Sequence, residues 1–189
     1  MGRWEPNARE RLAEAALELY SERGYEQTTV AEIAKRAGLT ERTFFRHYAD
    51  KREVLFGGSS ALQELFVNAV AEAPEPVAPM DAIAAALEAV SKVFDDGRRE
   101  HSRQRQAVIM ANAELQEREL IKLASLSAAL ADALRRRAVT EPAASLTAEA
   151  GIAVFKVGFE RWIAEAEQRT LSQVTREALA QLKAVTAGR

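Results

Sequence analysis

Residues 28–55 (TTVAEIAKRAGLTERTFFRHYADKREVL) contain two short helical patterns joined by a tight turn, and they constrain the fold most. Apolar positions suited to packing the two helices together lie on both sides of this turn: Ile33, Ala34, Ala37, Leu39 and Phe44. Gly38 can adopt the positive φ that closes a helix. Thr29 with Glu32 predicts a capping box at the first helix, and Thr40 is expected to cap the second.

A helix-turn-helix of this kind places its second helix in the major groove of DNA. The local charge fits, because residues 35–52 carry six basic side chains against two acidic ones. Alanine and glycine at this spacing also occur in generic helical hairpins, so the spacing alone leaves that alternative open. Thr28 and Thr29 before the first helix, and His47 and Lys51 after the second, favour DNA binding.

Residues 7–56 closely resemble the N-terminal domain of TetR-family transcriptional regulators. The resemblance is carried jointly by these residues: Gly24-Tyr25, Thr28-Thr29-Val30, Ile33-Ala34, Ala37-Gly38-Leu39, Thr43, His47-Tyr48 and Asp50-Lys51. It implies an all-α fold of about nine helices. An N-terminal three-helix DNA-binding domain would occupy residues 1–56, and a helical effector-binding and dimerisation domain would occupy residues 57–189.

The resemblance also assigns DNA-binding positions. It implies that Thr29, His47 and Lys51 hold phosphates. It places four side chains toward the major groove: Arg42, Thr43, Phe45 and Arg46. Thr40, the expected cap of the second helix, completes the predicted DNA site. The chain departs from the family at two positions, since the family usually has Tyr at Phe45 and often a small residue at Arg42.

Composition limits the alternatives. The 189 residues carry a net charge of −2, so DNA affinity has to come from a local basic surface. The absence of cysteine excludes disulfides, thiol catalysis and Cys-based zinc sites. His47 and His101 lack a second ligand three or four residues away, so no metal site is expected. With no apolar leader segment and no membrane-length apolar run, we expect a cytoplasmic protein without membrane contact.

The remainder of the chain is predicted to be helical, because Ala, Leu, Glu and Arg dominate it. Asp50 with Glu53 is expected to cap a fourth helix that continues to about residue 73 and contains Gly57-Gly58. The segment PEPVAP at 74–79 predicts a loop. The later helices are predicted at about 81–96, where Gly97 ends the helix, at 98–138 as two helices breaking near 112–115, and at 147–168 and 172–186.

Phe155, Phe159 and Trp162 recur at helical spacing and form one aromatic stripe. Such a stripe is more often core than cavity wall. In the TetR-family picture it would line a small-molecule pocket, with Phe66, Phe94 and Met110 as further wall residues.

Gly151 and Gly158 allow close helix approach, either within the subunit or at a dimer seam. The dimer is preferred, with an interface expected at Gly151, Val154, Gly158, Leu179 and Leu182. Gly57-Gly58 is read as a hinge between effector sensing and DNA release. The alternative is that these two glycines only let the first helix pack closely.

We find no nucleophile elbow, P-loop or dinucleotide fingerprint, so no enzymatic activity and no cofactor are expected. The sequence predicts a homodimeric regulator that binds a palindromic DNA operator. We expect it to be a repressor released by a small, largely apolar effector. The alternative is that its C-terminal domain responds to a protein partner.

Overall fold

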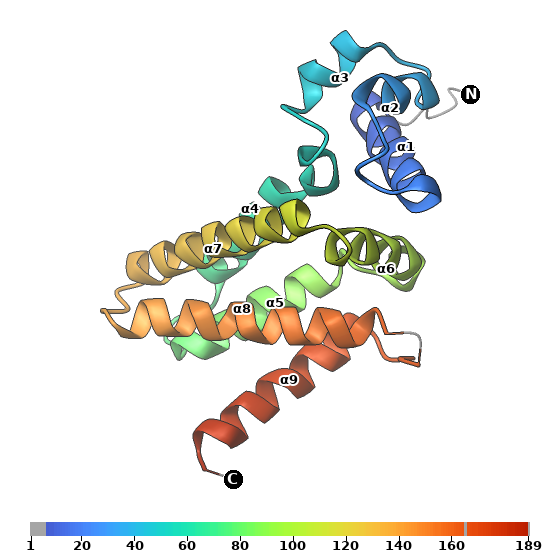
Figure 1. Cartoon of the computed structure of the whole chain (residues 1–189). Helices are drawn as coiled ribbons and strands as arrows, with labels where there is room; N and C mark the ends of the chain where they lie inside the picture. The colour runs from blue at the N-terminus through green and yellow to red at the C-terminus, as the bar shows by residue number, and fades with distance from the viewer. Residues whose placement is uncertain (1–6, 165, 189) are drawn as a thin grey trace, which may run out of the picture. The chain divides into compact units, whose positions relative to one another are not determined.

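The computed structural model describes residues 7–164 and 166–188, and within them the fold is all-α, as predicted (Figure 1). The described residues form nine α-helices and one 3-10 helix, η1. Their bounds are α1 Ala8–Arg23, α2 Val30–Arg36, α3 Glu41–His47, η1 Glu53–Phe56, α4 Ser59–Glu72, α5 Pro79–Ser91, α6 Asp96–Met110, α7 Ala113–Arg136, α8 Ala143–Trp162 and α9 Leu171–Thr186.

Contacts divide the chain into two compact units. The first unit contains the residues up to Ser59 together with Gln104–Leu120, and the second contains Ser60–Arg103 and the residues from Ile121 onward. The first division therefore falls three residues after the boundary predicted at 56/57. The inclusion of residues 104–120 in the first unit was not foreseen.

Local capping explains where the first three helices begin and end. The Asn7 side chain accepts a hydrogen bond from the Glu10 amide and caps α1. Thr29 and Glu32 form the predicted capping box of α2, and the Thr40 side chain accepts from the Thr43 amide at α3. Gly38 has a φ of 66°, as expected for the residue that closes α2. The caps predicted at Thr29 and Thr40 are confirmed.

The second half of α6 and the start of α7 complete the core of the first unit. Val108, Ile109 and Leu115 are buried there with residues of α1, α2 and α3. Arg105, on α6, donates from Nε to the Leu55 carbonyl at 2.8 Å. Its guanidinium also stacks on Phe56 and pairs with Glu119. Burial lowers the pKa of Arg105, which the neighbouring Glu119 carboxylate partly offsets.

The predicted continuous fourth helix is wrong. Asp50 accepts hydrogen bonds from the amides of Arg52 and Glu53, as a cap should, but it starts only the short helix η1. Gly57 and Gly58 then form a turn, and α4 begins at Ser59. The two glycines thus separate η1 from α4, because glycine has a low helix propensity and two in succession interrupt a helix.

Gly57 also supports the close-packing alternative. A Cβ there would lie 3.1 Å from both Cε1 and Oη of Tyr48, and the Gly57 carbonyl accepts a 2.7 Å hydrogen bond from Arg9 on α1. Gly58 faces open space. The hinge role of the pair remains a prediction.

In the second unit α8 packs against α5 and α9, which also contact each other (Figure 1). Buried residues of α4, α5, α7, α8 and α9 form one apolar core. Gly151 and Gly158 are buried contacts within this core: a Cβ at Gly151 would lie 2.7 Å from Ile83 on α5, and a Cβ at Gly158 would lie 2.6 Å from Thr175 on α9. The structure therefore favours the within-subunit alternative for both glycines.

The predicted boundary between the fifth and sixth helices is also wrong. Helix α5 ends at Ser91, and Gly97 lies in the first turn of α6 instead of ending α5. Asp95, just before α6, accepts a hydrogen bond from the Arg98 amide at 3.0 Å. This local side-chain cap restarts the helix despite the glycine. Phe94 consequently lies in the turn between the two helices.

Two arginines of α6 hold the connection between α8 and α9. Arg99 donates to the carbonyls of Glu167 and Arg169, and Arg103 donates from Nε to the Ile163 carbonyl at 2.7 Å. Helix α8 ends at Trp162, earlier than the predicted residue 168, and Glu165 in that predicted range lies outside the described residues.

One stretch of the described residues, Glu53–Glu72, is long and apolar enough by length and composition to cross a membrane, whereas we expected no such run from the sequence. Core segments of soluble proteins pass the same test. Val54 and Phe56 are buried in the core of the first unit, and Phe66 and Val70 in that of the second. These four apolar side chains of the stretch are thus used in packing.

The two neighbouring glycines give a matched pair of stability predictions. Gly57→Ala should destabilise the protein by about 1–3 kcal/mol, because Tyr48 is buried and its hydroxyl is held by the Arg9 carbonyl. Gly58→Ala should be neutral or stabilise by roughly 0.4–1 kcal/mol through the unfolded chain. Urea denaturation of both variants checks this, and equal effects would contradict the placement of Gly57 against Tyr48.

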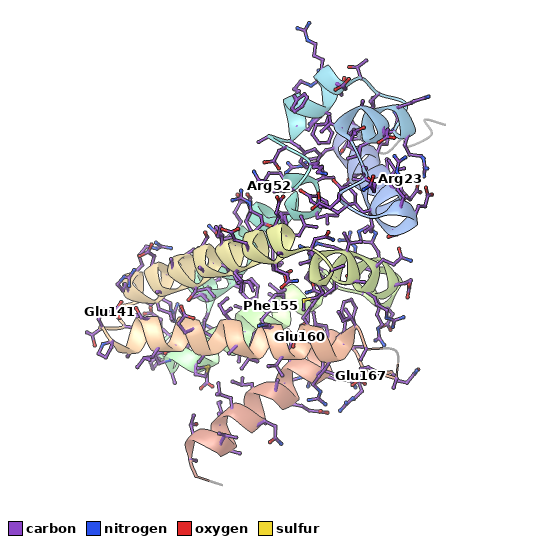
Figure 2. All side chains as sticks on the ribbon, in the orientation of Figure 1. Arg23, Arg52, Glu141, Phe155, Glu160 and Glu167 are labelled. Atoms are coloured by element: carbon purple, nitrogen blue, oxygen red, sulfur yellow. The ribbon has the colours of Figure 1, made fainter. Side chains whose placement is uncertain are left out.

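A pH prediction concerns Glu167 (labelled in Figure 2). Hydrogen bonds from the Arg169 side chain, then from the backbone amides of Arg169 and Gln168, lower the pKa of Glu167 from 4.5 to about 2. Its contribution to stability is complete above pH 4.5 and is lost as the pH falls from 4.5 toward 2. The difference in free energy of unfolding between wild type and Glu167→Gln should shrink from pH 6 to pH 3. A difference independent of pH would refute the assignment.

Candidate nucleic-acid interface

Helix α3 is anchored on one side and open on the other. Phe44 is fully buried among Leu12, Ile33 and Ala37 in the core of the first unit. Its neighbour Phe45 is 56 % exposed. Successive residues of a helix point about 100° apart, so burying Phe44 leaves the next positions facing solvent.

The exposed face of α3 presents three side chains at helical spacing. Arg42, Phe45 and Arg46 are all exposed, and their i, i+3 and i+4 positions place them on one face. Thr43 is half-buried, and its hydroxyl lies 3.0 Å from that of Thr40. This arrangement offers guanidinium donors and an apolar ring to a partner surface, which are groups suited to base edges and thymine methyls.

Ion pairing removes two of the six basic side chains between residues 35 and 52. Arg36 pairs with Glu18 and Glu22 on α1, its hydrogen bonds to the Glu22 and Glu18 carboxylates raise its pKa, and Arg52 pairs with Asp50 at 2.6 Å. The Lys51 ammonium is held by backbone carbonyls, as described below. In the described part of the chain, no carboxylate pairs with Lys35, Arg42 or Arg46. The available positive charge between residues 35 and 52 therefore lies mainly on α3 and at the end of α2.

Thr29, a predicted phosphate ligand, is exposed but engaged. Its hydroxyl donates to Glu32 Oε2 at 2.8 Å, and its amide donates to the same oxygen at 2.9 Å. These two bonds hold the Glu32 carboxylate charged, and they lower its pKa. A phosphate at Thr29 has to displace or tolerate this carboxylate, so the phosphate role remains a prediction.

Lys51 is held inside the first unit. Its ammonium donates to the carbonyls of Tyr25 at 3.0 Å and Thr28 at 3.2 Å, and lies 3.5 Å from the carbonyl of Glu26. It also lies 4.2 Å from the centre of the Tyr25 ring. An ammonium has three donors, and all three are directed at carbonyls in this arrangement. Lys51 therefore fixes the connection between α1 and α2, and its phosphate contact is untested.

His47 ends α3 and is partly exposed. Its Nε2 atom is buried and has no hydrogen-bond partner among the residues that the structure describes. A phosphate contact without ring movement would therefore have to use Nδ1.

Sequence reasoning missed the tyrosines that organise this unit. Tyr25 is 2 % exposed and packs edge-on against Tyr20, whose hydroxyl donates to the Lys51 carbonyl at 2.7 Å. Burial raises the pKa of both phenols well above the usual value. Gly24-Tyr25 and Asp50-Lys51 both belong to the family motif. Because motif residues far apart in sequence often meet in space, the motif could have indicated that Tyr25 and Lys51 are in contact.

The predicted pocket residues divide into two groups. Phe66, Phe94, Phe155, Phe159 and Trp162, the aromatic cluster, lie together in the second unit with neighbouring ring centres 5.4–6.4 Å apart. Phe155, labelled in Figure 2, contacts Phe66, Phe94 and Phe159. Met110 is 60 % exposed and belongs to the first unit, so its assignment to the same wall is wrong.

The predicted dimer residues face this chain's own core. Val154 is 2 % exposed, Leu179 is 8 % exposed, and Leu182 packs against the same core. Exposed apolar side chains on the same helices include Val157 on α8 and Val185 on α9. The five predicted interface residues stay a prediction, but the structure already uses them in intrachain packing.

Within residues 7–164 and 166–188, no group of three or more metal-binding side chains is placed to hold a metal ion. The site geometry therefore rests on arginine, lysine, threonine and aromatic side chains. Their chemistry is that of a nucleic-acid surface.

Two protein families match the chain. Residues 12–56 match the bacterial regulatory proteins of the tetR family, and residues 77–187 match the MftR C-terminal domain. The second match alone spans more than half of the 189 residues.

Two relatives are named as regulators. The chain is 42 % identical over 89 residues to the HTH-type transcriptional regulator TcmR of Streptomyces glaucescens, covering 47 % of this chain and 39 % of TcmR. It is 28 % identical over 137 residues to a Mycobacterium tuberculosis protein named "Putative mycofactocin biosynthesis transcriptional regulator MftR", covering 72 % of this chain and 69 % of MftR. The chain thus matches less than half of the length of TcmR.

Solved structures share the fold. A transcriptional regulator from Pseudomonas aeruginosa has a TM-score of 0.66 at 19 % identity, covering 98 % of this chain and 94 % of that chain. The complex of SmeT with triclosan has a TM-score of 0.65 at 20 % identity, covering 95 % and 91 %. The family matches, the relatives and the helix-turn-helix geometry agree, and the chain belongs to the TetR family of DNA-binding transcriptional regulators.

Proposed function

We propose that the protein is a homodimeric repressor that binds a palindromic operator and leaves it when a small, largely apolar effector binds the second unit. The observation that carries the DNA half is the exposed face of α3. There Arg42 and Arg46 have no carboxylate partner among the residues that the structure describes, and buried Phe44 anchors the opposite side of the helix. The action is expected in the cytoplasm, where the operator is.

The dimer follows from the size of this face. One seven-residue helix reaches few base edges, so specific affinity requires two half-sites on one duplex. Two copies related by a two-fold axis match a palindromic operator. A homodimer is also typical of the family.

The aromatic cluster supports an apolar effector. Five aromatic side chains from α4, α5–α6 and α8 gather in the second unit, and Phe94 and Phe159 remain partly exposed. Two fold relatives were solved with ligands that combine a large apolar body with polar atoms: SmeT with triclosan, and FadR of Bacillus subtilis with stearoyl-CoA, at a TM-score of 0.58. The comparisons give no support to a protein partner as effector.

The proposal is tested by selecting the DNA that the purified protein retains from its own genome, and then measuring release. We expect a palindromic site bound by a dimer. We expect small apolar molecules to lower operator affinity and to raise the melting temperature of the free protein. A monomer at micromolar concentration, measured by sedimentation, would overturn the dimer. An operator complex that no small molecule weakens would overturn the effector.

The first prediction from the exposed face of α3 concerns base reading. Arg42→Ala should leave folding within about 0.5 kcal/mol of wild type, since Arg42 is exposed and has no ion-pair partner in the described residues. It should cost about 1–3 kcal/mol of operator affinity at one base position, if its guanidinium reads a guanine. Binding-site selection checks this, and an unchanged preferred sequence refutes base reading.

A second prediction separates the structural role of Lys51 from a phosphate contact. Lys51→Met keeps the apolar stem and removes the ammonium from its carbonyl partners, so it should destabilise folding by about 1–3 kcal/mol. Lys35→Met, at an exposed lysine without an ion-pair partner in the described residues, is the control and should stay within about 0.5 kcal/mol. Denaturation without DNA measures both. If Lys51→Met is as stable as wild type, the structural role of the Lys51 ammonium is refuted, and the DNA contact is left as its only proposed role.

A further inference from the structure

The aromatic cluster contains a buried polar group that its packing does not explain. Trp162 is fully buried, and its Nε1 atom has no hydrogen-bond partner among the described residues. Phe94 and Phe159 contact the indole with ring centres 6.0 Å and 5.8 Å away, but neither supplies an acceptor. A buried tryptophan N–H normally finds a partner, and leaving it without one costs free energy.

A second unpaired donor lies beside the first. The Arg99 guanidinium lies over the Trp162 ring, with its central carbon 5.4 Å from the ring centre. Its terminal nitrogens are bound by Asp96 and by the carbonyls of Glu167 and Arg169. Its Nε is buried and has no partner in the described chain. The guanidinium covers the face of the indole and leaves the indole N–H unsatisfied.

Two of the rings that contact the Trp162 indole, Phe94 and Phe159, are partly exposed. Phe94 lies in the turn between α5 and α6, so its ring is attached to backbone outside a helix. Phe159 lies one helical turn from Phe155 on α8, and Phe94 and Phe159 meet edge-on at 5.7 Å. Because the rings contact one another, a ligand must displace at least one of them, and Phe94 is the ring with the least helical restraint.

We propose that the aromatic cluster selects an effector with a flat aromatic body and an oxygen acceptor. The body takes the place of the Phe94 ring against Phe159 and Trp162, and the oxygen accepts a hydrogen bond from Trp162 Nε1. Arg99 Nε is the second donor and favours an anionic oxygen. This assignment rests on the proposed function and adds the chemical class of its effector. A purely apolar ligand would leave both donors unsatisfied.

The test uses three probes that share one ring system: naphthalene, 1-acetylnaphthalene and 1-naphthoate. Affinities are measured by calorimetry on the full chain. We expect 1-acetylnaphthalene to bind about tenfold more tightly than naphthalene, because it supplies the missing acceptor. We expect 1-naphthoate to bind at least as tightly as the ketone. Equal affinities of naphthalene and 1-acetylnaphthalene, or binding of none of the probes, overturn the proposal.

A matched variant tests the contribution of the indole N–H. Trp162→Phe keeps an aromatic ring and removes Nε1, so it should abolish the preference for 1-acetylnaphthalene while naphthalene binding is retained. Arg99→Lys keeps the charge and removes Nε, so it should reduce the advantage of 1-naphthoate over the ketone. If Trp162→Phe still prefers 1-acetylnaphthalene over naphthalene as wild type does, the role of Nε1 is refuted. If Arg99→Lys leaves the affinity ratio of 1-naphthoate to 1-acetylnaphthalene unchanged, the role of Arg99 is refuted.

Spectroscopy tests the site without relying on the folding of the Trp162 variant. The chain has two tryptophans, so Trp4→Phe leaves Trp162 as the only tryptophan whose emission is observed on selective tryptophan excitation. Binding of 1-acetylnaphthalene should change the emission of Trp162, and unchanged emission during calorimetrically detected binding overturns the site. Release of the operator by an unrelated molecule, with no acceptor preference among the probes, would keep the proposed function and refute this inference.

Discussion

The burial of Phe44 is the interaction on which the DNA-facing part of the structure depends. Helix α3 has seven residues, and isolated helices shorter than about 12–15 residues are marginal in water. Its stability must therefore come from packing, and Phe44 supplies that packing at 0 % exposure. Thr40 fixes where the helix begins, so the orientation of Arg42, Phe45 and Arg46 is set by one cap and one buried ring.

Charge pairing then decides which basic residues are available. The sequence shows six basic side chains between residues 35 and 52, but Arg36 and Arg52 are neutralised by neighbouring carboxylates, and Lys51 is directed at backbone carbonyls. Exposed ion pairs such as Arg36–Glu22 contribute little to stability. The ion pairs of Arg36 and Arg52 do neutralise the positive charge at those two positions. The positive charge that remains between residues 35 and 52 lies mainly on the exposed face of α3.

Local signals were predicted well because local physical chemistry decides them. The caps at Thr29 and Thr40, and the positive φ of Gly38, each depend on residues within a few positions in the sequence. Five of the six predicted pocket residues form the aromatic cluster. Helical periodicity together with the family resemblance predicted that these five lie close together. Function at the level of a DNA-binding regulator followed from the same N-terminal motif.

The sequence predictions were weakest where contacts made by other residues, near or far in the sequence, outweigh the preference of a single residue. Gly97 suggested a helix end, yet the Asp95 cap starts α6 around it. For Gly151 and Gly158 a seam between subunits was preferred over packing within the subunit; Ile83 and Thr175 of the same chain occupy the space above them, and the seam stays a prediction. The family resemblance suggested Met110 as a residue of the aromatic wall. The resemblance does not say which core each part of a helix joins, and the second half of α6 joins the first unit.

Helix α6 contributes residues to both units. Its first half carries Arg99 and Arg103, which hold the connection between α8 and α9 beside Trp162. Its second half carries Val108 and Ile109, which are buried in the core that also contains Phe44. Coupling between two sites requires an element whose arrangement both sites bias. On the proposed function, a molecule that engages Arg99 would bind the first half of a helix whose second half completes the core that contains Phe44.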